Sequence, residues 1–108
     1  SEKRGGVGIQ CFLEVFVSDG RQEKLFRAAL DRNMKSLSKF NVVYNVTRTT
    51  KKKKSSNNIA PTEEDGAFLT TYIIFPANFE FESWQSSLQK HVLQEGLHLP
   101  LHITLIAR

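Results

Sequence analysis

The stretch Gly66-Ala67-Phe68-Leu69-Thr70-Thr71-Tyr72-Ile73-Ile74-Phe75 is the most concentrated run of β-branched and aromatic residues in this chain. The turn-forming pair Asp65-Gly66 opens it, and Pro76-Ala77-Asn78 follows it. A run of this kind, bounded by turn residues and too short for a buried helix, predicts a strand. Both of its faces are largely apolar, which is typical of a strand in the middle of a sheet.

Two strands and one helix are expected before this stretch. Residues 9–17 carry apolar side chains at every odd position, and this alternation predicts a strand. Asp19 can cap a helix over 21–38, in which apolar residues recur at three- and four-residue steps. Residues 42–50 are rich in Val, Thr and Tyr and predict a second strand.

One helix and one strand are expected after it. Asn78 can cap a helix over 79–95, which Gly96 can end, and residues 101–108 alternate as a last strand. The order strand, helix, strand, strand, helix, strand predicts an α+β, ferredoxin-like βαββαβ fold. This fold is a four-stranded antiparallel sheet with two helices on one face, and its other face is open.

The 108 residues are expected to form one domain with a single modest core. Residues 1–8 hold three glycines and mixed charges and are expected to be a disordered lead-in to a domain over 9–108. Residues 51–65 are strongly polar and predict a flexible loop within that domain. Since the chain does not begin with Met, we expect it to be part of a longer protein.

The cysteine content and the hydropathy of the chain indicate the cellular compartment in which the protein is expected. The single cysteine, Cys11, allows no disulfide within the chain, which is typical of a reducing compartment. No apolar run approaches the roughly 20 residues of a membrane span, so we expect no membrane partner. The expected localisation is intracellular, either nuclear or cytoplasmic.

The net charge of +4 is unevenly distributed. Residues 21–54 carry eleven Lys and Arg against two acids, whereas residues 55–108 carry two against six. In the expected topology the start of the first helix and the loop after the second strand lie at the same end of the sheet. Basic side chains should converge there: Arg21, Lys24, Arg48, Lys51, Lys52, Lys53 and Lys54. Such a cluster can neutralise nucleic-acid phosphates, although a solvated lysine loop has the same composition.

Four aromatic side chains are expected on the open face of the sheet: Phe12, Phe16, Phe68 and Tyr72. Aromatic side chains on such a surface can stack single-stranded bases, or they can pack against protein. In topology and in the placement of these aromatics the chain resembles the RNA recognition motif, which implies binding of single-stranded RNA. The signature of that family requires Lys or Arg before its glycine. Here Asp65-Gly66-Ala67-Phe68-Leu69 matches the glycine and little else.

Catalytic and metal-binding patterns are weak. His102-Ile103-Thr104-Leu105 resembles the His-x-Thr-x element of two-histidine phosphoesterases, but that family needs two such elements, and His91 and His98 lack the pattern. One Cys and three scattered His cannot close a tetrahedral zinc site. We therefore expect no enzymatic activity, no cofactor and no metal.

The expected function is that of a non-catalytic interaction module. It would bind a protein partner or a second copy of itself through the open sheet face or through an edge of the sheet. The alternative is a single-stranded RNA-binding domain that uses the sheet aromatics and the lysine loop. A protein partner or homodimer is favoured, because the signature lacks its basic residue and an apolar face is costly to leave in water.

Overall fold

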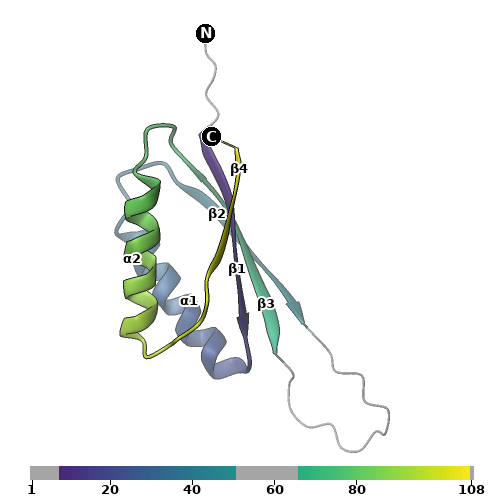
Figure 1. Cartoon of the computed structure of the whole chain (residues 1–108). Helices are drawn as coiled ribbons and strands as arrows, with labels where there is room; N and C mark the ends of the chain where they lie inside the picture. The colour runs from purple at the N-terminus through teal and green to yellow at the C-terminus, as the bar shows by residue number, and fades with distance from the viewer. Residues whose placement is uncertain (1–7, 51–65, 108) are drawn as a thin grey trace, which may run out of the picture.

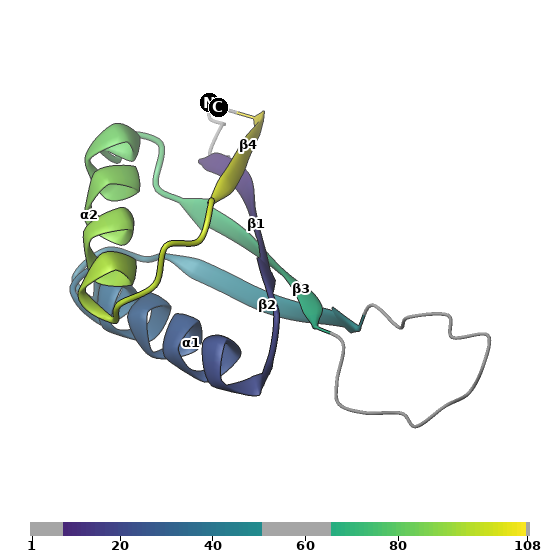
Figure 2. The same ribbon diagram turned by 60° about the horizontal axis from the view of Figure 1, so that its bottom comes forward.

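The computed structural model describes residues 8–50 and 66–107, and this part of the chain folds into a four-stranded sheet with two helices on one face (Figures 1 and 2). The elements are β1 (Ile9–Val17), α1 (Gly20–Lys35), β2 (Val43–Thr50), β3 (Ala67–Phe75), α2 (Phe81–Gln94) and β4 (His102–Ala107). The strand order is β2-β3-β1-β4 and every neighbouring pair is antiparallel. The predicted ferredoxin-like fold is confirmed, while most of the expected lead-in and the whole expected 51–65 loop lie outside the described residues.

The pairing of β1 with β3 forms the middle of the sheet. Its register runs without interruption from Ile9 opposite Phe75 to Val17 opposite Ala67. Because side chains alternate along a strand, every odd-numbered residue of both strands faces the helices and is buried. The helices cover this face with large buried side chains: Phe26 and Leu30 from α1, and Trp84 and Leu88 from α2. Burying each such side chain stabilises the fold by about 1.5–3 kcal/mol.

The edge strand β4 is covered less well. Leu105 lies opposite the buried Cys11 and therefore on the helix side of the sheet, yet its side chain is 41% exposed. The register shifts between Gln10 and Cys11, and β4 lies at the edge of the sheet. The helices therefore bury the inner strands more completely than the edge.

The predicted cap at the start of helix α1 is confirmed, but the helix ends earlier than predicted. Asp19 caps α1, and its Oδ1 accepts a hydrogen bond from the Gln22 backbone N–H at 2.9 Å. Gln22 Oε1 in turn accepts from the Ser18 backbone N–H, also at 2.9 Å, so the Gln22 side chain reaches back to the residue before the cap, in a variant of the capping box. Helix α1 ends at Lys35, three residues before the predicted end, because residues 36–39 form turns.

The start of helix α2 differs from the prediction, whereas Gly96 lies after its end as predicted. The predicted cap Asn78 is wrong: the cap position is Glu80, which makes no side-chain capping bond. The Phe79 backbone N–H donates to the Pro76 carbonyl at 3.0 Å, so Asn78 lies inside a turn that precedes the helix. Gly96 follows the helix with φ +80°, the left-handed conformation that favours glycine, as predicted.

A buried polar bridge joins the two helices. Asn33 of α1 is fully buried; its Oδ1 accepts a hydrogen bond from Trp84 Nε1 at 2.8 Å, and its Nδ2 donates to Ser87 Oγ at 3.2 Å. Buried polar groups of this kind stabilise a structure only when they are paired. The bridge therefore specifies how α1 and α2 pack.

The bridge predicts the effect of Asn33→Leu. The substitution leaves the Trp84 indole N–H buried without an acceptor, which should lower the free energy of unfolding by about 1–3 kcal/mol. Urea titration followed by Trp84 fluorescence measures the change. Ser87→Ala is the matched control, because it removes only the longer hydrogen bond and should cost less. An equal loss in both variants would contradict the assigned role of the indole.

Thr71 supplies a second test of the core. It is fully buried on the helix side of β3, and its Oγ1 has no hydrogen-bond partner in the structure. Since Val has a similar shape and no unpaired hydroxyl, Thr71→Val should raise the free energy of unfolding by up to about 1 kcal/mol. Thr70→Val, on the half-buried open face, is the control in the same urea titration. A less stable Thr71→Val protein would refute this reading.

Candidate interaction surface on the open sheet face

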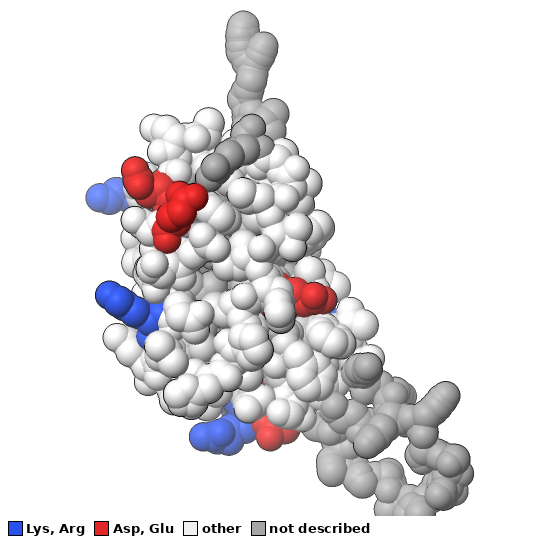
Figure 3. Space-filling model, viewed as in Figure 1, with Lys and Arg blue, Asp and Glu red and all other residues white. Residues whose placement is uncertain are grey.

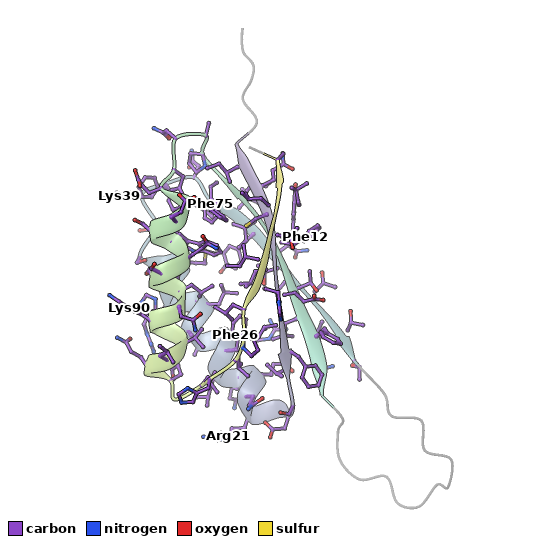
Figure 4. The ribbon with its side chains drawn as sticks, in the orientation of Figure 1. Phe12, Arg21, Phe26, Lys39, Phe75 and Lys90 are labelled. Carbon is purple, nitrogen blue, oxygen red and sulfur yellow. The ribbon has the colours of Figure 1, made fainter. Side chains whose placement is uncertain are left out.

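Four aromatic side chains from β1 and β3 gather on the face of the sheet away from the helices. The register places Phe12 opposite Tyr72 and Phe16 opposite Phe68, with ring centroids 5.3 and 5.0 Å apart. We call these four side chains the aromatic platform. Phe12 is 41% exposed and Phe16 is 40% exposed. Figure 4 shows Phe12 on the opposite side of the sheet from Phe26 and Phe75, which lie between the sheet and the helices.

Local contacts hold the platform in place. The Tyr72 hydroxyl donates a hydrogen bond to Gln10 Oε1 at 2.8 Å across the strand pair. At the other end the Phe16 ring lies against Gly66, where an added Cβ would come within 2.6 Å of the ring. Gly66 also has φ +98°, which a side chain disfavours. The glycine matched to the RNA-binding signature therefore has a structural role of its own here.

A carboxylate lies at the centre of the platform. Glu14 is between Phe12 and Phe16 on β1, and the register places it opposite Thr70 on one side and His102 on the other. Phe12, Glu14, Thr70, His102 and Thr104 line a shallow hollow of about 260 Å³. The alternation of β1 already placed Glu14 on this face, but the position of His102 depends on the register of β4.

The flanks of the platform are polar and uncharged. Strand β2 contributes Asn45, Thr47 and Thr49, which lie opposite Tyr72, Thr70 and Phe68. Strand β4 contributes Thr104, opposite Phe12. No position of the four described strands on this face is Lys or Arg. The described open face is thus apolar along its middle, hydroxyl-rich at its sides, and acidic at one point.

The predicted basic cluster is not assembled around this platform by the described residues. Arg48 lies opposite the buried Leu69, so its side chain is on the helix side of the sheet. Its Nε donates to Glu23 Oε1 at 2.9 Å, and its Nη1 donates to Thr50 Oγ1 at 2.8 Å. Arg21 and Lys24 are exposed on the first turns of α1, and Lys51, Lys52, Lys53 and Lys54 lie outside the described residues. In Figure 3 most of the visible Lys and Arg atoms lie along the helix side.

Glu23 joins β2 to α1 electrostatically. Its second carboxylate oxygen, Oε2, accepts from Arg27 Nε at 3.1 Å. Burial by itself would raise the pKa of the Glu23 carboxyl, but the hydrogen bonds and charges of Arg48 and Arg27 outweigh burial and hold the pKa below its usual value. Glu23, one of the two acids among residues 21–54, therefore neutralises part of the positive charge of this region.

This pairing predicts a pH-dependent stability. A carboxyl whose pKa is lowered by folding stabilises the protein above its unfolded pKa, and the stabilisation is lost as the pH falls through the folded pKa. Because Arg48 is partly exposed, Glu23→Gln should lower the free energy of unfolding at pH 7 by only about 0.5–1 kcal/mol. The difference from the parent protein should shrink between about pH 5 and pH 3.

Urea titrations at pH 7, 5 and 3 measure this difference. Asp31→Asn is the control, because Asp31 makes only an exposed helical pair with Lys35 at 3.4 Å. A Glu23→Gln penalty that stays constant over the whole pH range would show that the carboxylate charge is not what joins β2 to α1.

Reactive groups are scarce in the described part of the chain. The Cys11 side chain is fully buried, and burial raises the pKa of its thiol to about 11, so it is not a nucleophile at neutral pH. Residues 8–50 and 66–107 contain no group of three or more His, Cys, Asp or Glu that could hold a metal ion. Neither α1 nor α2 is long and apolar enough to cross a membrane.

Comparison with known proteins identifies the fold. No protein family matches the sequence, and no curated protein is similar to it. Among solved structures, the de novo designed protein Foldit4 is 11% identical with a TM-score of 0.60, over 93% of this chain and 97% of that one. The C-terminal domain of the MgtC protein from Mycobacterium tuberculosis is 13% identical with a TM-score of 0.54, over 98% of this chain and 95% of that domain.

A third structure contains this fold within a larger protein. It is a hydantoinase/carbamoylase family amidase from Burkholderia ambifaria, 9% identical with a TM-score of 0.60. The match covers 94% of this chain but only 28% of the amidase. At these identities the likeness shows the fold alone, and function has to be argued from the surface of this chain.

Proposed function

We propose that this chain is a non-catalytic interaction module that holds a protein partner, or a second copy of itself, against the aromatic platform. One observation carries the proposal: four aromatic side chains, of which Phe12 and Phe16 are exposed, run along the centre of the sheet with no cation beside them among the described residues. Aromatic side chains are enriched in the central contacts of protein interfaces, and polar residues surround them at the rim. The threonines and asparagine of β2 and β4 match such a rim.

The charge on the face favours protein over RNA. A nucleic-acid strand laid on the platform would bring phosphates near Glu14, and the described strands offer no Lys or Arg there to neutralise them. A protein partner can instead meet Glu14 with a basic side chain or a backbone N–H. The RNA alternative rests on the stacking capacity of Phe12 and Tyr72 and on the four lysines after β2.

The function test compares Phe16→Ala and Tyr72→Ala with Leu93→Ala. Leu93 is 47% exposed on α2, away from the platform, so its variant controls for a general loss of apolar surface. Sedimentation of the parent protein measures self-association. If the chain is a dimer through the platform, Phe16→Ala should weaken it by about 2 kcal/mol or more, and Leu93→Ala should not.

If the parent protein is a monomer, affinity purification of its partner follows, and the purified partner is titrated against the same variants. Mixed single-stranded oligonucleotides at two salt concentrations form the RNA arm. Binding that falls steeply with salt and loses about 1–3 kcal/mol in Tyr72→Ala would favour RNA. Partner binding or dimerisation that Phe16→Ala leaves unchanged would overturn the proposed interface.

A further inference from the structure

A groove of about 360 Å³ lies on the helix side of the molecule, where the α1–β2 connection meets the start of α2. Leu37 and Phe40 line it from the connection, and Phe79 and Trp84 line it from the α2 side. Figure 1 shows both connections at the same end of the molecule, and the Phe40 and Phe79 rings touch, with centroids 5.2 Å apart. The volume is in the range of small-ligand sites, at its lower end.

The walls of this groove are held by the core. Phe79 stacks on the buried Phe75, with ring centroids 4.4 Å apart and planes 2° from parallel. Phe40 meets Phe79 edge to face, at an interplanar angle of 85°, and is itself 42% exposed. Asn33 holds the Trp84 indole from beneath. Walls that are already ordered lose little conformational entropy when a ligand binds.

One side of the groove is polar and carries a single charge. The exposed Glu80 and Ser83 line it from the first turns of α2, and Ser87 lies one turn further along. Among the described residues, Glu80 is the only ionisable side chain that lines the groove, and its carboxylate is not used to cap the helix. In Figure 3 acidic atoms lie over this end of α2, with basic atoms beside them.

The lining selects the chemistry of a ligand. Phe40 and Phe79 supply aromatic carbon to the lining, and the Glu80 carboxylate beside them carries the charge that attracts a cation. The full charge of Glu80 repels an anion more strongly than the N-terminus of α2, with roughly half a charge, attracts it, and a neutral apolar molecule would gain only from burial. An ammonium group substituted with alkyl groups suits both features, because it is charged but weakly hydrated and can lie against aromatic carbon.

We propose that this groove binds a small organic cation, a substituted ammonium whose apolar body rests on Leu37, Phe40 and Phe79 and whose charge lies at Glu80. The site is on the opposite side of the sheet from the aromatic platform. It therefore does not depend on the proposed interaction function, and the two can fail separately.

Three probes of similar size and different charge test the site on the whole chain by NMR. They are benzyltrimethylammonium, benzyl alcohol and phenylacetate. The cation should shift the backbone resonances of Phe79, Glu80 and Ser83 in a saturable way, whereas phenylacetate should bind more weakly than the cation. Glu80→Gln should weaken binding of the cation about two- to five-fold and leave benzyl alcohol unchanged.

Glu82→Gln is the matched control, because Glu82 has the same charge and lies two residues away but does not line the groove. It should leave the affinity for the cation nearly unchanged. Ser83→Lys should weaken binding of the cation at least as much as Glu80→Gln does, since it places a positive charge beside Glu80 at an exposed position of the groove.

Three results would overturn the proposal. The first is a phenylacetate affinity equal to that of the cation. The second is a Glu80→Gln protein that binds the cation as well as the parent does. The third is an absence of shifts in the groove at probe concentrations up to roughly ten millimolar, the range of a very weak ligand.

Discussion

The antiparallel pairing of β1 with β3 is the constraint on which the rest of this structure depends. It is the longest uninterrupted register in the sheet, and it separates the side chains of two strands into a buried set and an open set. A slip of one residue would exchange the two sets, placing Glu14 in the core and Leu13 in water. The hydrophobic core and the aromatic platform are therefore two results of one register.

The helices are positioned by a different kind of interaction. Apolar packing alone tolerates small shifts of one helix along another, whereas the hydrogen bonds from Trp84 and Asn33 are satisfied in a single arrangement. That arrangement also places the start of α2 beside Phe40, which forms the groove. A polar contact in the core thus determines a surface feature on the helix side.

The sequence predicted most of the fold because its periodic patterns are long. The alternation of residues 9–17 and 67–75 was sufficient to place Phe12, Phe16, Phe68 and Tyr72 on one face, where the structure has them. The helix ends were less predictable, since the turn at Pro76 and the turns after Lys35 depend on local hydrogen bonds that no period reveals. Contacts between residues distant in sequence set a third limit on prediction. The exposure of Leu105 depends on its place at the sheet edge, and the burial of Asn33 depends on its hydrogen bonds to α2.

Charge was the property least readable from sequence. Residues 21–54 carry most of the positive charge, yet much of it in the described part is answered locally by acids. Arg27 and Arg48 share Glu23, Arg32 meets Glu95 at 2.8 Å, and Lys35 meets Asp31. These pairs lie on α1, α2 and the helix side of β2, and none faces the platform. Within residues 8–50 and 66–107, the positive charge therefore forms no basic surface beside the aromatics. At the centre of the described open face, the charge nearest to the aromatic side chains is that of Glu14.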